Sequence, residues 1–148
     1  MDDEYYMRQA LAEARAAFEA GEVPVGAVVV ADATGRIIGR GHNMTEALGD
    51  VTAHAEMLAV TAAQTALGGK YLRGCTLYVT VEPCTMCAGA IGWSQMSRIV
   101  IGTDDEKRGY TTFCAPGRSP FHVRARVDRG VLEEECAKLM RNFFRGLR

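Results

Sequence analysis

Residues 80–87 read Thr80-Val81-Glu82-Pro83-Cys84-Thr85-Met86-Cys87. This stretch joins a β-rich run over residues 75–81 to a helix-like run over residues 88–96, so the two cysteines lie where a strand gives way to a helix. An α-helix turns once in about 3.6 residues, so cysteines three positions apart face the same side. The positive partial charge at a helix N-terminus lowers the pKa of a thiol and favours the thiolate. We therefore predict a metal-binding thiolate pair at this junction.

A second short motif, His54-Ala55-Glu56, lies thirty residues before Cys84, at the start of a helix-like run rich in alanine. One imidazole and two thiolates give three protein ligands for a tetrahedral zinc and leave the fourth position open for water. An open position distinguishes a catalytic zinc from a structural one. On an ideal helix Glu56 points about 200° away from His54, so we expect it beside the open position as a proton carrier rather than as a ligand.

Two other interpretations of the cysteine pair compete with a catalytic zinc. A thioredoxin-like redox pair has the same Cys-x-x-Cys spacing, but it has no use for His54 and Glu56. A structural zinc usually has a fourth cysteine or histidine at motif spacing, and only His42, His122 and scattered cysteines remain. We expect those two histidines to be structural. The role of Glu82 stays open, because its carboxylate either hydrogen-bonds the metal loop or faces solvent.

Length and charge limit the function classes. The 148 residues suit one domain over residues 1–148, and no apolar run approaches the ~18 residues needed to span a bilayer. Three of the first four residues are acidic, which is the wrong charge for a signal peptide, so we expect a cytoplasmic protein. The net charge of −1 does not by itself indicate a nucleic-acid binder, although residues 118–148 hold eight basic and four acidic residues. We interpret Cys75, Cys114 and Cys136 as small buried hydrophobes.

Strand-like and helix-like runs alternate along the chain. The predicted helices cover residues 3–20, 53–67, 85–94 and 131–147, and the predicted strands cover residues 23–31, 36–41, 75–81, 98–102 and, at a sheet edge, 121–127. We interpret residues 42–51 as a polar loop and residues 103–120 as irregular. The alternation predicts an α/β fold, a three-layer αβα sandwich around a mixed five-stranded sheet. A hairpin makes part of that sheet antiparallel, and helical crossovers make part of it parallel.

At the cysteine and histidine motifs the sequence resembles a known family. His54-Ala55-Glu56 and Pro83-Cys84-Thr85-Met86-Cys87 match the signature of zinc nucleobase deaminases. The chain resembles most closely the bacterial tRNA-specific adenosine deaminases, in matches that follow one order over nearly the whole chain except residues 108–127. These matches are Gly21-Glu22-Val23-Pro24-Val25-Gly26-Ala27-Val28, Thr52-Ala53-His54-Ala55-Glu56, Leu77-Tyr78-Val79-Thr80-Val81-Glu82-Pro83-Cys84, Met86-Cys87-Ala88-Gly89-Ala90-Ile91 and Leu132-Glu133-Glu134-Glu135-Cys136.

The resemblance implies a cytidine-deaminase-like fold and one Zn²⁺ per chain. Its ligands are then His54, Cys84 and Cys87, and Glu56 is the proton shuttle. The resemblance also implies a homodimer built on the helix after the cysteine pair. The small residues and single tryptophan of residues 88–93 suit such an interface, although an ordinary buried helix has the same composition.

Three further positions are assigned by the resemblance as substrate contacts. Asn43 matches a residue whose side-chain amide hydrogen-bonds the purine, and an amide offers both a donor and an acceptor. Val25 matches an apolar position that lines the base pocket. Asp105 matches a residue near the flipped nucleotide.

The implied function is hydrolytic deamination of adenosine to inosine at the wobble position of tRNA. Glu56 deprotonates a zinc-bound water, and the hydroxide attacks C6 of the flipped adenine. The anticodon loop is the expected partner, and Arg141, Arg145 or Arg148 are expected to contact its phosphates.

Residues 108–127 depart from the family pattern in a region expected to frame the anticodon loop, so two alternatives remain. The first is a deaminase of a free nucleobase or nucleoside, of guanine or cytosine type, with the same zinc site. The second is a non-catalytic subunit that only binds RNA, and the intact Glu56 argues against it.

Overall fold

The computed structural model describes residues 1–147, so the predicted phosphate contact of Arg148 lies outside the described residues. The elements follow one another as α1 (Asp3–Glu19), β1 (Gly26–Ala31), β2 (Arg36–His42), α2 (Thr45–Leu48), α3 (Ala55–Leu67), β3 (Cys75–Val81), α4 (Thr85–Trp93), β4 (Arg98–Thr103), α5 (Tyr110–Phe113), β5 (Arg126–Arg129) and α6 (Glu133–Gly146). In the described part of the chain, no helix combines the length and the apolar character needed to cross a membrane.

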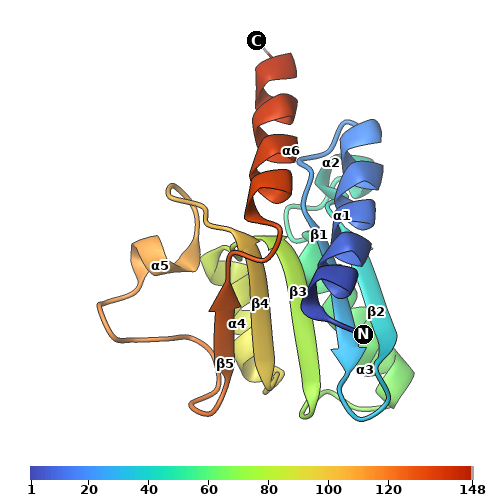
Figure 1. Ribbon diagram of the computed structural model, residues 1–148, viewed down its shortest axis with the longest axis vertical. Helices are drawn as coiled ribbons and strands as arrows, with labels where there is room; N and C mark the ends of the chain where they lie inside the picture. Colours follow the sequence, from blue (N-terminus) through green and yellow to red (C-terminus); the bar gives the residue numbers. More distant parts are fainter. Residues whose placement is uncertain (148) are drawn as a thin grey trace.

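The strands form one mixed sheet in the order β2-β1-β3-β4-β5 (Figure 1). β1 pairs antiparallel with β2 and with β3, whereas β3, β4 and β5 are parallel. This mixed five-stranded sheet confirms the predicted fold class. Because the parallel strands run in one direction, their C-terminal ends meet at one edge of the sheet, where ligands bind in open α/β sheets. The loop that carries Cys84 leaves β3 at this edge.

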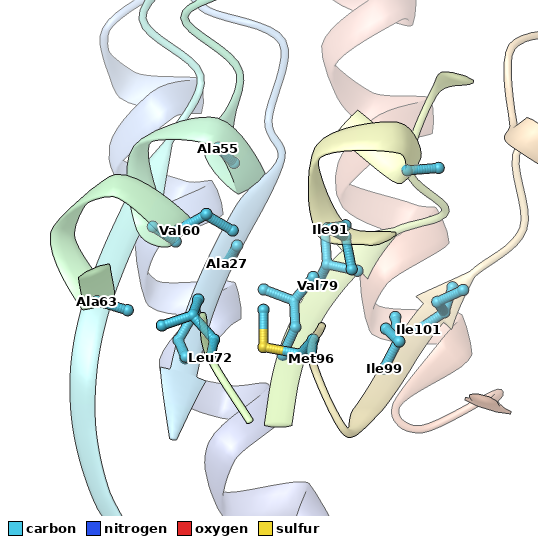
Figure 2. Close-up of a cluster of buried hydrophobic side chains, with 14 of the residues drawn as sticks. Ala27, Ala55, Val60, Ala63, Leu72, Val79, Ile91, Met96, Ile99 and Ile101 are labelled. Carbon is cyan, nitrogen blue, oxygen red and sulfur yellow. The ribbon is translucent and has the colours of Figure 1, made fainter. Parts of the chain in front are cut away.

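Helices cover both faces of the sheet, with α1 and α6 in front and α3 and α4 behind in Figure 1. Successive residues of β1 point to opposite faces: Val28 and Val30 pack with α1, and Ala27 and Val29 pack in the cluster that lies against α3 and α4. Figure 2 draws the second cluster, in which Val60, Ile91 and Val79 come from two helices and the central strand. Burial on both faces explains why β1 is apolar without alternation.

Two short helices contradict the predictions of loop and irregular structure. Residues 42–51 contain α2, whose N–H groups at Glu46 and Ala47 donate to the buried carboxylate of Glu22 at 3.0 and 2.8 Å. A cap supplied from more than twenty residues away leaves no local pattern. Residues 103–120 contain α5, whose first residue Tyr110 is buried.

The edge strand is present but displaced along the sequence. It was expected over residues 121–127 and lies at Arg126–Arg129, because Arg98↔Arg126 and Ile101↔Arg129 fix its pairing with β4. β1 likewise begins at Gly26 rather than at Val23. All five cysteines are free: Cys75 and Cys136 are buried as predicted, whereas Cys114 is only half-buried.

Candidate active site

Two helix N-termini bring the metal ligands together. His54 is the N-cap of α3 and Cys84 is the N-cap of α4, both with extended backbone, and α3 and α4 pack on the same face of the sheet. Cys87 follows in the first turn of α4 and is fully buried. The positive ends of both helix dipoles therefore point at the cluster, where they stabilise thiolates.

The donor atoms have the spacing of a metal site. His54 Nδ1 lies 3.5 Å from Cys87 Sγ and 3.7 Å from Cys84 Sγ, and all three donor atoms lie within 4.8 Å of one another. Tetrahedral zinc with Zn–S near 2.3 Å and Zn–N near 2.0 Å places its ligands about 3.5–3.8 Å apart. One nitrogen and two sulfurs at these distances fit one zinc ion and leave one coordination position without a protein ligand.

The two thiols are not equivalent. The hydrogen bond from Cys87 is the largest of several effects that lower the pKa of Cys84 to about 4, and hydrogen bonding to His54 acts in the same direction. The hydrogen bond to Cys84 and burial raise the pKa of Cys87 instead. Hydrogen bonding to Cys84 raises the pKa of His54. Of the two thiols, Cys84 is thus the one whose surroundings favour the thiolate.

Glu56 belongs to the cluster without being one of its ligands. The residue is only 4% exposed, and burial raises the pKa of its carboxyl to about 7. The carboxyl interacts with the thiol of Cys87, but the set of close donor atoms comprises His54, Cys84 and Cys87 without it. His54 caps the helix with extended backbone and lies outside its regular turns, so the angle of about 200° expected between His54 and Glu56 on an ideal helix does not apply.

Asn43 and Val25 lie next to the cluster and next to each other. The Asn43 N–H donates to the Val25 carbonyl at 3.2 Å, and Asn43 Oδ1 accepts the N–H of Ala55 at 2.8 Å. The Asn43 side chain therefore caps α3 directly behind His54. Its NH₂ group makes no hydrogen bond to another residue in the described range 1–147 and remains able to donate. Val25 is buried at the edge of the core cluster.

Asp105 lies in the loop after β4, in a different part of the chain from Asn43 and Val25. Its carboxylate accepts the N–H groups of Lys107 and Arg108, each at 3.0 Å, and so closes its own turn. Its backbone N–H donates to Glu82 Oε1 at 3.4 Å, which links this loop to the residues just before Cys84.

Glu82 resolves the question left open by the sequence. Its side chain is 1% exposed and accepts hydrogen bonds from the loop after β4 and from Arg129, so it does not face solvent. Burial raises the pKa of Glu82, but its hydrogen bonds to Thr111 and Arg129 outweigh burial and lower it. Arg129 has no motif around it in the sequence, and only the pairing of β5 with β4 brings it to Glu82.

Residues 121–127 do not all lie near the metal ligands. His122, Val123 and Arg124 line a hollow of about 490 Å³ together with Arg73 and Gln95, at the edge where the parallel strands begin. The cysteines follow the opposite end of β3. Within one chain, residues 122–125 therefore lie at the edge of the sheet away from the predicted metal ligands. His42 hydrogen-bonds Glu13 at 3.0 Å, as suits a structural histidine.

The arrangement is suited to hydrolysis. A cation with an open coordination position is a Lewis acid for water, and a buried carboxyl beside it is placed to accept and return protons. Neither a redox pair nor a closed structural zinc accounts for Glu56.

Comparison with known proteins agrees with this chemistry. A family model described as the cytidine and deoxycytidylate deaminase zinc-binding region matches residues 1–103. The tRNA-specific adenosine deaminase of Bacillus subtilis is 48% identical over 148 residues, covering 99% of this chain and 91% of that protein.

Two solved structures have similar folds. One, from a study of A-to-I editing by tRNA:A34 deaminases at the wobble position of transfer RNA, has a TM-score of 0.81 at 44% identity and covers 91% of this chain and 98% of that one. The other is a guanine deaminase from Nitrosomonas europaea, with a TM-score of 0.81 at 26% identity, covering 96% of this chain and 84% of that one.

Proposed function

Because the chain belongs to the zinc-binding cytidine and deoxycytidylate deaminase family, we propose that it hydrolyses adenosine to inosine at the wobble position of tRNA. The observation that carries the proposal is the convergence of His54, Cys84 and Cys87 beside the buried carboxyl of Glu56. The relatives supply the substrate class, since the Bacillus subtilis protein is named for tRNA and matches this chain from end to end.

His54, Cys84 and Cys87 are proposed to hold one zinc ion per chain. Zinc bound there lowers the pKa of water toward about 7, so that a nucleophile exists at neutral pH. Glu56 accepts one proton of the attacking water and delivers it to N1 of the adenine; it then takes the remaining proton from the oxygen on C6 and gives it to the departing exocyclic amine. Water adds to C6, the C6–N bond breaks, and the products are inosine and ammonia.

Substrate orientation is proposed to depend on the residues around the cluster. The NH₂ group of Asn43 donates to an acceptor on the purine edge, because its oxygen is already used by the N–H of Ala55. Val25 supplies apolar contact for the base. Asp105 acts at the nucleotide by way of the loop after β4, whose turn its carboxylate closes.

A polynucleotide substrate is favoured by α6. Figure 1 shows this helix extending past the end of the sheet, on the side where the parallel strands end. Arg141 and Arg145 are exposed on it, and Arg141 also pairs with Glu134 at 2.6 Å. Cations in this position suit phosphates of the anticodon stem and loop.

A free-base deaminase is the second candidate, because the Nitrosomonas europaea guanine deaminase has the same fold. The deciding experiment incubates the zinc-loaded protein with total tRNA and, separately, with adenosine, guanine and cytosine, followed by mass spectrometry of the products. We expect inosine at position 34 of tRNA and no turnover of the free compounds. Turnover of a free base with unchanged tRNA would reject the proposal in favour of the second candidate.

The chain is further proposed to act as a cytoplasmic homodimer of a single deaminase domain, residues 1–148. Trp93 is 85% exposed at the end of α4 and, with Met57, Val60 and Tyr71, lines a hollow of about 410 Å³. Exposed apolar patches often mark protein–protein contact sites, and a second copy packed against this one would remove it from water. Trp93→Glu should convert the dimer to a monomer in analytical ultracentrifugation. The five free thiols suit a reducing compartment.

A further inference from the structure

The carboxylate of Glu82 is a buried hydrogen-bonding centre two residues before Cys84. Its oxygens accept four hydrogen bonds: from Arg129 Nη1 at 3.1 Å, from Thr111 N at 3.0 Å, from Thr111 Oγ1 at 2.6 Å and from Asp105 N at 3.4 Å. Three of the four come from residues 104–111, the loop that follows β4. Glu82 thus binds the loop directly to the segment that carries the metal ligands.

Arg129 holds the same loop from the other side. From β5 its guanidinium donates to Asp104 Oδ1 at 2.7 Å and to the Tyr110 hydroxyl at 2.9 Å, and it lies 5.6 Å from the centre of the Tyr110 ring. The Glu82–Arg129 pair therefore connects β3, β5 and both ends of the loop. Arginine suits this position because its planar group donates in several fixed directions.

The loop has little freedom to shift against the pair. A side chain at Gly109 would collide with the Glu82 carboxylate, and the Tyr110 N–H donates to the Pro83 carbonyl at 2.9 Å. Glu82 therefore fixes the position of Asp105, the residue expected to act at the nucleotide.

A purely stabilising role is the simpler account of such a pair. An ion pair with one buried partner is, however, weak support for stability, because desolvation of the Glu82 carboxylate offsets its attraction to the Arg129 guanidinium, whose side chain is 32% exposed. Of the four hydrogen bonds to Glu82, one comes from Arg129, one from Asp105 N and two from Thr111 in α5, so the carboxylate joins segments that the turn closed by Asp105 does not itself connect. The pair instead fixes where the turn lies relative to the metal ligands.

We propose that Glu82 and Arg129 are positioning residues that hold the 104–111 loop in register with the metal site and thereby set the affinity for the RNA substrate, without taking part in the chemical step. This inference rests on the proposed function, because it takes the loop to contact a nucleotide next to the reacting adenine.

The first test compares steady-state kinetics on a tRNA anticodon stem-loop. Glu82→Gln keeps the shape of the side chain but removes its charge, and Arg129→Lys keeps the charge but removes the planar fork. We expect KM to rise about tenfold or more in each, because a misplaced contact loop weakens binding strongly. The value of kcat should stay within about twofold, and zinc content by atomic absorption should stay at the wild-type value.

A milder variant and a matched control distinguish a loss of loop positioning from a general loss of stability. Thr111→Val removes the hydrogen bond from the Thr111 hydroxyl to Glu82 but leaves the Glu82 carboxylate paired with Arg129. We expect a smaller rise in KM in the same direction. Asp3→Asn breaks a comparable ion pair, with Arg98 at 2.7 Å, at the edge where β4 begins. This control should lower stability and leave KM unchanged.

Hydrogen–deuterium exchange of the free, zinc-loaded protein tests the loop without reference to any activity. Glu82→Gln should speed exchange in residues 104–112 and leave residues 84–93 as in the wild type, while Asp3→Asn should affect neither segment. If the wild type fails to deaminate tRNA, the proposed function is wrong, and faster exchange in the loop still supports its attachment to Glu82.

Three results overturn the positioning role. The first is loss of zinc in Glu82→Gln, which makes Glu82 a support of the metal ligands. The second is a fall in kcat at unchanged KM, which makes it part of the chemical step. The third is unchanged loop exchange together with unchanged KM, which leaves the pair with no effect on the loop.

Discussion

His54 and Cys84 are both N-caps, and this shared position explains why two residues thirty apart meet. An N-cap lies outside the regular turns of its helix, so its side chain projects beyond the helix end. α3 and α4 pack side by side on one face of the sheet, so their N-terminal ends bring the two caps within hydrogen-bonding distance. Cys87 and Glu56 occupy the first turns behind these caps, where they are buried and held by the helix backbone.

Substitution of Glu56 separates proton transfer from metal binding. Glu56→Ala should keep the proposed one zinc per chain and lose about 10²–10⁴-fold in kcat, because the carboxyl is proposed to move protons and not to bind the metal. Cys87→Ala, three helix positions from the other thiol, should instead lose zinc and activity together. Metal content by atomic absorption and single-turnover inosine formation give both readouts. Loss of zinc in Glu56→Ala would make the carboxylate a ligand.

At the scale of elements, glycines on β2 allow α3 to pack directly on the sheet. A Cβ built on Gly41 would lie 2.5 Å from the Ala55 carbonyl oxygen and 2.9 Å from the Ala59 nitrogen, both backbone atoms of α3. Gly39 is similarly close to Ala59 and Ala63 one turn later. Close packing of α3 matters for the site, because His54 is the N-cap of this helix.

Gly41→Ala should therefore destabilise the fold by about 1–3 kcal/mol, because backbone atoms cannot move aside as a flexible side chain can. The matched control is Gly69→Ala, at a glycine with no atom within 4 Å of the added group. It should change the free energy of unfolding by less than about 0.5 kcal/mol. Urea unfolding of the two zinc-loaded variants measures both values, and equal effects would refute the packing argument.

An ion-pair network joins α1 to the sheet at the edge away from the metal ligands. Arg98 donates to both oxygens of Asp3, at 2.8 and 2.7 Å, and to Asp128 at 2.8 Å, while the Tyr78 hydroxyl donates to Asp3 at 2.7 Å. Hydrogen bonding to Arg98 lowers the pKa of Asp3 to about 2 against the opposing effect of burial.

The depressed pKa of Asp3 gives a pH-dependent contribution to stability. A carboxyl with a folded-state pKa below its unfolded value of 3.8 stabilises the protein above about pH 4, and this contribution is lost as pH falls toward 2. Asp3→Asn should thus lower the free energy of unfolding by about 1 kcal/mol at pH 7, a value discounted for the partial exposure of Asp3, and the difference from wild type should shrink as pH falls through 2 and vanish below it. Glu4→Gln, whose partner Arg8 is 57% exposed, should have less effect. A difference that stays constant with pH would show that the charge of Asp3 is irrelevant.

At the scale of the whole molecule, charge is distributed unevenly. The chain carries a net charge of −1, yet residues 118–148 hold twice as many basic as acidic residues. Arg126 and Arg129 pair with carboxylates near β5, whereas Arg141 and Arg145 are exposed on α6, where Arg141 also pairs with Glu134. The two arginines of α6 are the ones proposed to contact a large polyanion.

Salt dependence tests that placement. For the double variant Arg141→Ala, Arg145→Ala, we expect weaker binding of the tRNA stem-loop and a slope of log Kd against log salt that is shallower by about two, one for each lost phosphate contact. A matched control is Arg36→Ala on β2, an exposed cation away from α6, which should leave the slope unchanged. An unchanged slope in the double variant would place the RNA elsewhere.

Much of the fold was predictable, because the strands and long helices have strong local patterns. β3 is confirmed at the predicted residues, Cys75–Val81, since its alternating run is rich in β-branched and aromatic residues, which are typical of strands. α2 was not predicted, because the carboxylate of Glu22 that caps it lies far away in the sequence. β5 was predicted at the wrong residues, because its position is fixed by pairing with β4. The sequence also predicted which donor residues the structure brings together, since few chemistries use two thiols, an imidazole and a carboxyl.

The sequence alone determined the donor set, the strand-to-helix junction and the family, because these depend on residue identity and on patterns within a few residues. Only the tertiary structure decided that Asn43 Oδ1 caps α3, that residues 122–125 lie at the far edge of the sheet, and that Glu82 meets Arg129. Each of these joins segments far apart in the chain. Hydrogen bonds between such segments depend on strand order and helix packing, and no local pattern in the sequence records them.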